Sequence, residues 1–159
     1  MLGLKECLKF LDSLNIEYRR VNHPAVYTIN EVNSVNFEGK EKCVKNLFLR
    51  DDKKENYYLV VVEPYKNINM KILRDKIQSR RLSFASEEDL KKYLGLEKGA
   101  VTPLGIFNNI EKNVIVVFDS DISGEIGIHP LVNTCSIFLE SHILKDLIKK
   151  EYKLIEVSI

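Results

Sequence analysis

Apolar residues recur along this chain with two different periods. Near the N-terminus they return every three or four positions, which predicts an amphipathic helix over residues 3–14. Residue types that favour helix ends, including the capping-box pair Thr28 and Glu31, predict four further helices. These expected helices cover residues 28–35, residues 69–78, residues 86–95 and a segment that begins with Ser141 as its cap.

Runs of apolar and β-branched residues predict the strands of a sheet. The expected strands cover residues 43–50, 57–63, 113–119, 134–140 and 154–157. The third of these is apolar on both faces, as in a central strand. Helices and strands interleave, but several strands follow one another through short loops. We therefore expect one domain over residues 1–159 with a mixed α/β (α+β) fold, in which helices flank a mixed central sheet of about six to seven strands.

Composition narrows the function classes. The formal net charge of +1 excludes a uniformly basic nucleic-acid binder, so any contact with RNA must come from a local patch. The 3 cysteines are odd in number and far apart, which favours free thiols in a reducing compartment. The sequence shows no signal peptide and no apolar run of about 20 residues, so we expect a cytoplasmic protein. It also lacks a G-x-S-x-G elbow, a P-loop and a G-x-G-x-x-G fingerprint.

Two polar residues interrupt the strand expected at residues 43–50. Successive side chains of a strand point to opposite faces, so Lys45 and Asn46 point in opposite directions, each among apolar neighbours. A buried ammonium is costly without a partner. Lys45 therefore either lies near a sheet edge with its amine in water, or lines a cleft and meets a phosphate or carbonyl oxygen. The pattern alone leaves both interpretations open.

A second candidate is a glycine- and proline-containing loop. It runs Gly99-Ala100-Val101-Thr102-Pro103, and Gly105 follows it. Glycine lets the backbone of such a loop approach a ligand closely, and its exposed amides could hold a developing oxyanion. An ordinary tight turn explains the same residues, and the loop by itself does not decide between the two.

His129 precedes a proline just before an expected strand. It either forms the wall or an acid–base group of a pocket, or has a structural role. Asp119 and Asp121 follow the expected central strand and enter a turn with two glycines. Turn chemistry explains these carboxylates better than a hard-metal site, so we expect no metal there.

A basic cluster is the last candidate. Arg80 and Arg81 follow Ser79, with Lys71 and Lys76 nearby. Such a cluster either holds a phosphate backbone or forms an ordinary solvated surface.

Six segments, taken in order, make the chain resemble the YbaK/prolyl-tRNA-synthetase-associated editing-domain family. They are His23-Pro24 with Val26-Tyr27-Thr28, Lys45 to Asp51, Arg81 to Ser86, Leu94-Gly95, Gly99 to Gly105, and His129 to Thr134. The similarity covers roughly residues 15–150 and is strongest to the family's free-standing Ala-tRNA(Pro) deacylases. Each motif is weak by itself, but their order and spacing are specific.

The resemblance implies hydrolysis of an aminoacyl ester on the terminal adenosine of tRNA. It implies that Lys45 is important for activity, that the Gly99–Pro103 loop approaches the ester, and that His129 lines the amino-acid pocket. Our mechanistic hypothesis adds Asn46 as a neutral hydrogen-bond partner. Arg80 and Arg81 are then expected to bind the nucleic acid. Similar enzymes use the ribose hydroxyl of the substrate, so no metal and no cofactor are expected.

Two points stay open within this resemblance. Ile128 stands before His129 where the family pattern favours an aromatic residue, which leaves the pocket size open between alanine, cysteine and another small residue. The expected partner is the acceptor end of mischarged tRNA(Pro), and the resemblance also raises prolyl-tRNA synthetase as a partner. A non-catalytic module that only binds an amino acid or tRNA is the alternative from another class.

Overall fold

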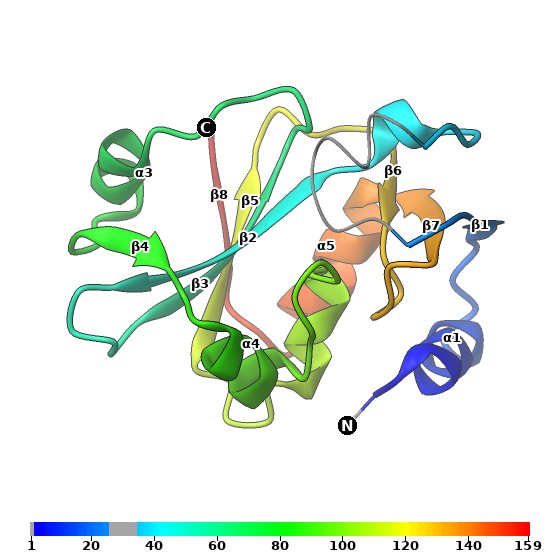
Figure 1. The fold of residues 1–159 in the computed structure, drawn as a ribbon, viewed down its shortest axis with the longest axis horizontal. Coiled ribbons are helices and arrows are strands. Elements are labelled where there is room, and N and C mark those ends of the chain that lie inside the picture. Colours follow the sequence, from blue (N-terminus) through cyan, green and yellow to red (C-terminus); the bar gives the residue numbers. More distant parts are fainter. Residues whose placement is uncertain (1, 26–34) are drawn as a thin grey trace.

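The computed structural model describes residues 2–25 and 35–159. Within these ranges eight strands form two separate sheets (Figure 1). The five-stranded sheet has the order β4-β2-β3-β5-β8, and the three-stranded sheet has the order β1-β7-β6. The five-stranded sheet consists of β2 (Lys45–Asp51), β3 (Tyr57–Val62), β4 (Leu82–Phe84), β5 (Val114–Asp119) and β8 (Leu154–Val157). The three-stranded sheet consists of β1 (Arg19–Asn22), β6 (Glu125–Ile128) and β7 (Cys135–Glu140).

The helices cover the faces of these sheets because each has one apolar side. They are α1 (Leu4–Ser13), α3 (Met70–Ile77), α4 (Glu87–Leu94) and α5 (Ser141–Lys149), with short 3-10 helices η1 (Lys40–Lys42) and η2 (Pro103–Asn108). The larger core joins both sheets with α1, α4, α5 and η2. The smaller core lies between the other face of the five-stranded sheet and α3.

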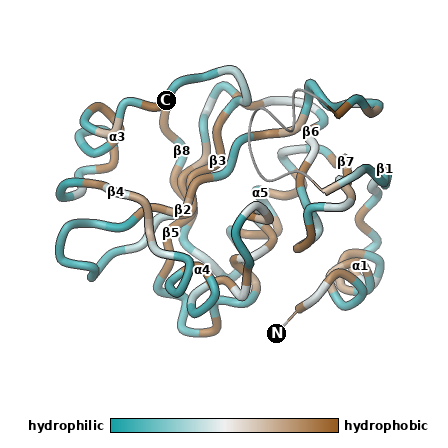
Figure 2. The backbone as a smooth tube through the Cα atoms, viewed as in Figure 1, coloured by the Kyte–Doolittle hydropathy of each residue, from teal (hydrophilic) through white to brown (hydrophobic). Residues whose placement is uncertain are grey.

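The mixed pairing of the large sheet follows from how its strands are connected. Strand β2 pairs antiparallel with β3 across the loop at residues 52–56, whereas β3 pairs parallel with β5 and β5 parallel with β8. Every residue of β3 is buried, as expected for a central strand covered on both faces. Figure 2 shows the same distribution, with apolar residues along the central strands and polar residues in the loops.

The structure confirms the mixed α/β class and corrects its details. The expected single central sheet is divided in two, because β1, β7 and β6 form a sheet of their own, which meets the chain just before β2 through a bridge between Gly127 and Cys43. Ser141 does not cap α5: Glu140 occupies the cap position, and the amide of Ser141 donates to the carbonyl of Gly124. The helix expected over residues 28–35 lies almost entirely outside the described residues.

Strand β6 occupies part of the segment that was expected to be a turn with two glycines. Gly127 is paired with Phe138 of β7, and a Cβ atom at Gly127 would lie 2.7 Å from both Cys43 Sγ and an atom of the Phe138 ring. Glycine in a strand interior often marks such a close approach of neighbouring groups.

We expect Gly127→Val to lower the free energy of unfolding by about 2 kcal/mol, because overpacking a core forces its neighbours to move. Urea denaturation measures the change, with Ser123→Val, at an exposed position of the preceding turn, as the control. Equal unfolding midpoints for Gly127→Val and the wild type would contradict the close packing described here.

Candidate active site

Lys45 is the first residue of β2 and its amine is held by the main chain. Its Nζ donates a hydrogen bond of 2.6 Å to the carbonyl oxygen of Lys66, in the loop that follows β3. The side chain is half-buried, so it neither extends freely into water nor lies in the apolar core. An ammonium has three N–H donors, and Lys66 is the acceptor for one of them among the described residues.

Strand β2 is open at the end where Lys45 lies. Strand β4 pairs only with Leu49–Asp51, and the amide of Val44 donates to the carbonyl of Gly127 in β6, so the described strands leave that edge of β2 unpaired between these two points. An unpaired edge presents free N–H and C=O groups to a ligand. Lys45 is therefore placed beside a stretch of main chain that can take part in binding.

Asn46 points to the opposite face of β2, as the alternation predicted. It shares that face with Val44 and Phe48, which belong to the larger core. Its Nδ2 donates to the carbonyl of Val44 at 3.4 Å, while its Oδ1 is buried and has no hydrogen-bond partner among the described residues. Buried acceptors are nearly always satisfied, so this oxygen can accept a hydrogen bond from a ligand.

The Gly99–Pro103 loop is a shaped turn that leads into η2. Gly99 has a φ of 86°, in the left-handed region that glycine adopts without strain. The amide of Ala100 donates to the carbonyl of Glu97, and Oγ1 of Thr102 accepts from the amide of Leu104. The amides of Gly99 and Val101 have no acceptor among the described residues. The loop thus has the free main-chain donors that an oxyanion needs.

One core joins the loop, the Asn46 face of β2 and the segment after His129. Val44, Val101 and Leu131 all pack against the larger core. The structure therefore brings Asn46, the Gly99–Pro103 loop and the His129 segment to the same core. The amine of Lys45 extends to the other face of β2, toward Lys66.

His129 lies at the end of β6 among polar neighbours. Its Nδ1 donates to the carbonyl of Cys135 at 3.2 Å, and its ring centroid lies 6.0 Å from that of His23. His23 in turn stacks on Phe37 at 4.4 Å and shares a hydrogen bond of 2.9 Å with Ser136. Burial lowers the pKa of His129, and the neighbouring His23 lowers it further, against the opposing effect of the bond to Cys135. His129 is therefore a neutral group near pH 7.

This lowered pKa predicts a stability change with pH. Because the folded pKa lies below the ordinary value of 6.5, the unfolded chain binds more protons in the range between the two values. The free energy of unfolding should therefore fall as pH decreases from about 7.5 to about 5.5, and His129→Gln should make that fall smaller. Urea denaturation at both pH values measures it. An identical pH dependence in the wild type and the variant would show that His129 does not contribute.

Arg80 and Arg81 lie at the other end of the sheet. Arg80 forms a two-point ion pair with Asp52, with distances of 2.6 and 3.0 Å, and Arg81 is exposed. Asp52 follows the end of β2, about 23 Å from Lys45 at about 3.3 Å per residue. The structure thus does not bring the two arginines together with Lys45, and Figure 1 shows the two ends of β2 far apart.

Asp119 and Asp121 bind a lysine. Nζ of Lys66 lies 2.9 Å from Asp119 and 2.6 Å from Asp121. Burial raises the pKa of Asp119, but hydrogen bonds from Lys66 and from main-chain amides outweigh this and leave the pKa below its ordinary value. Asp119 is thus a buried, ionised group with a charged partner. Among the described residues no group of three or more His, Cys, Asp or Glu could hold a metal ion.

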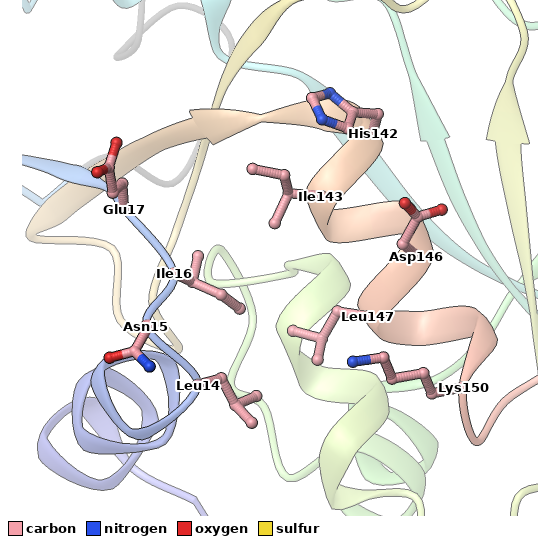
Figure 3. A pocket seen from close by; sticks show the side chains of 9 residues that line it. All are labelled: Leu14, Asn15, Ile16, Glu17, His142, Ile143, Asp146, Leu147 and Lys150. Carbon is pink, nitrogen blue, oxygen red and sulfur yellow. The ribbon is translucent and has the colours of Figure 1, made fainter.

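A groove of about 480 Å³ lies between the segment that follows α1 and helix α5 (Figure 3). Apolar side chains such as Ile16 and Leu147 line it, together with charged side chains such as Glu17 and Asp146. None of the residues predicted from sequence to form the site lines this groove. No helix among the described residues is long and apolar enough to span a membrane.

Comparison with known proteins adds three findings. A family profile described as the aminoacyl-tRNA editing domain matches residues 23–147. The chain is 44% identical over 141 residues to the prolyl-tRNA editing protein ProX of Acetoanaerobium sticklandii, covering 87% of this chain and 86% of that protein. It is 32% identical over 137 residues to the prolyl-tRNA synthetase associated domain-containing protein 1 of Danio rerio, covering 84% and 74% of the two chains.

A solved structure shows the same fold. It belongs to a protein assigned provisionally as a trans-editing enzyme for prolyl tRNA synthetase, and it superposes with a TM-score of 0.71. The superposition covers 100% of this chain and 99% of that chain at 17% sequence identity. The arrangement of the two sheets and their helices is therefore shared with a known structure.

Proposed function

Because the chain belongs to the family of aminoacyl-tRNA editing domains, we propose that it hydrolyses the ester of mischarged tRNA(Pro), with Ala-tRNA(Pro) as its substrate. The similarity to the ProX protein over most of both chains supports this reaction. The observation that carries the proposal is Oδ1 of Asn46, which has no partner within residues 2–25 and 35–159. This residue borders the same core as a loop with two amides that have no acceptor in those ranges.

The reaction adds water to an ester that is already activated. Water attacks the carbonyl carbon, the bond from that carbon to the ribose oxygen breaks, and a proton from the water passes to the departing ribose oxygen. The free amides of Gly99 and Val101 stabilise the negative charge that develops on the carbonyl oxygen. Alanine and uncharged tRNA(Pro) are the products.

The substrate itself supplies the group that relays the proton. The free hydroxyl of the terminal ribose lies next to the ester and can pass the proton from water to the leaving oxygen. Asn46 holds this hydroxyl in place, because its buried Oδ1 accepts one hydrogen bond. No nucleophilic side chain of the protein is required in this scheme.

Lys45 and His129 orient the two ends of the substrate. Lys45 uses the donors that Lys66 leaves free to bind a phosphate of the acceptor end. His129, neutral and half-buried, forms a wall of the amino-acid pocket that admits alanine and excludes the larger proline. Such a second site is needed because one small apolar difference is worth only about 1–3 kcal/mol at a single site.

Prolyl-tRNA synthetase is the proposed source of the substrate. The name of the Danio rerio relative refers to that synthetase, which supports an association in this family. The chain then removes alanine from tRNA(Pro) after the synthetase has released the mischarged product.

A panel of substrates tests the specificity. We expect hydrolysis of Ala-tRNA(Pro) to be about 100-fold faster than that of Pro-tRNA(Pro), as expected when a pocket excludes the larger side chain. Cys-tRNA(Pro) and Ser-tRNA(Pro) measured in parallel identify the preferred small residue. Faster cleavage of the cysteinyl ester would replace alanine by cysteine in the proposal. Saturable binding of all four without cleavage would favour a binding module.

A further inference from the structure

The loop that holds Lys45 is itself tied to a buried carboxylate. Asp119, the last residue of β5, is completely buried. It accepts a hydrogen bond of 3.3 Å from the amide of Glu63 and forms an ion pair of 2.9 Å with Nζ of Lys66. Residues 63–66 are thus attached to one carboxylate at both ends, and the amide of Lys66 closes the turn onto the carbonyl of Glu63.

This attachment fixes the acceptor used by Lys45. The carbonyl oxygen of Lys66 lies in the attached turn, and Lys45 donates to it at 2.6 Å. Lys45 is also paired with Val62 across the sheet, next to the start of the turn. Lys66 therefore contacts Lys45 through its main chain and Asp119 through its side chain. A shift of the turn would move the acceptor and release the amine.

We propose that Lys66 and Asp119 are positioning residues for Lys45, whose amine they hold in place through the main chain of residues 63–66. This inference rests on the proposed role of Lys45 in hydrolysis. Neither residue needs to touch the substrate. The long side chain of a lysine has considerable rotational freedom, so a fixed acceptor keeps its amine in the orientation that binding requires.

The chain provides a matched control for Lys66. Lys145 is 19% exposed and forms an ion pair of 2.8 Å with Glu156, whereas Lys66 is 18% exposed. Lys145→Met therefore removes a lysine of similar exposure from an ion pair that has no contact with Lys45 among the described residues, although its partner Glu156 is 37% exposed and Asp119 is fully buried. Lys66→Arg keeps the charge, and Lys66→Met removes the charge but keeps the main-chain carbonyl.

The test measures kcat and KM on Ala-tRNA(Pro) for these variants in the wild type and in the Lys45→Ala background. We expect Lys66→Met to lower kcat/KM about tenfold, Lys66→Arg to restore most of it, and Lys145→Met to change it little. In the Lys45→Ala background Lys66→Met should cause no further loss, because a residue that acts through Lys45 has nothing left to position.

A second measurement does not depend on turnover. Acetic anhydride labelling of the free protein, read by mass spectrometry, reports how accessible the amine of Lys45 is. Lys66→Met should increase its labelling relative to that of Lys53, an exposed lysine in the β2–β3 loop. If Lys66→Met does not fold, Asp121→Asn removes the exposed partner of Lys66 and should cause a smaller change of the same sign.

The outcomes separate this inference from the proposed function. The positioning role alone would be overturned if Lys66→Met lowered kcat/KM by the same factor in the wild type and in the Lys45→Ala background. It would also be overturned if Lys66→Met changed neither the activity nor the labelling of Lys45. Full activity of Lys45→Ala would overturn the role of Lys45 in the proposed function and the positioning role with it. Absence of hydrolysis by the wild type would overturn the proposed function itself.

Discussion

Lys45→Ala is expected to lower kcat/KM for the hydrolysis of Ala-tRNA(Pro) by about 100-fold, which corresponds to about 2.7 kcal/mol of transition-state stabilisation. The amine has donors beyond the one that Lys66 accepts, and charge-assisted bonds to phosphate are among the strongest that a side chain makes. Losing them would misplace the ester relative to the loop. Single-turnover and steady-state measurements separate the effects on chemistry and on binding.

The control for Lys45→Ala is Lys53→Ala, which removes an exposed lysine from the loop between β2 and β3. It should leave both kinetic constants and the unfolding midpoint unchanged, since surface substitutions are usually within about 0.5 kcal/mol. Full activity of Lys45→Ala would remove Lys45 from the mechanism. A similar loss in both variants would indicate only a general effect of positive charge on tRNA binding.

Gly99→Ala is expected to have the second-largest effect, with a fall in kcat of about 10- to 100-fold. The φ of 86° at Gly99 strains any other residue, and relief of the strain would turn the neighbouring amides away from the carbonyl oxygen of the ester. KM should change less than kcat, because these amides act mainly on the charge that develops in the transition state.

Gly124→Ala is the matched control for this loop. Gly124 has a similar φ of 73°, and a Cβ atom there would meet nothing within 4 Å. Both variants therefore carry a comparable backbone strain, of about 1 kcal/mol in stability, but only Gly99 lies in the proposed oxyanion loop. Equal kcat values for the two variants would show that the Gly99–Pro103 loop has no part in the chemistry.

The apolar pattern of the chain predicted the long strands and the helices well. Residues 43–50 and 113–119, expected as strands, correspond to β2 and β5 within two residues at each end. These segments are buried on both faces or alternate regularly, so their period is visible locally. The end of α4 was also predictable, because Gly95 adopts the left-handed conformation that ends a helix.

The short strands β1, β4 and β6 and the division into two sheets could not be predicted in this way, although β8 has the bounds expected from the sequence. Strand β1 pairs Arg19 with Phe138, a partner more than 100 residues away, and no local pattern encodes such a contact. Strand β6 contains Gly127, although glycine is rare in strands. Glycine stands at this position because Cys43 and Phe138 leave no room for a side chain.

For the candidate site, alternation correctly placed Lys45 and Asn46 on opposite faces of β2. The acceptor for the amine of Lys45 could not be predicted, because it is a main-chain carbonyl in the loop after β3. Every residue has a main-chain carbonyl, so the identity of a residue does not indicate which carbonyl accepts a given hydrogen bond. The ion pair between Asp119 and Lys66 could not be predicted either. The sequence indicated only a turn at Asp119, and its pairing with Lys66 depends on the folded chain.

The most direct measurement is single-turnover incubation of Ala-tRNA(Pro) with an excess of the wild-type protein, followed by quantification of free alanine and of intact ester. We expect the protein to convert the ester to free alanine and uncharged tRNA well above the rate of spontaneous hydrolysis. Ester loss at the spontaneous rate, although the tRNA is bound, would contradict this expectation.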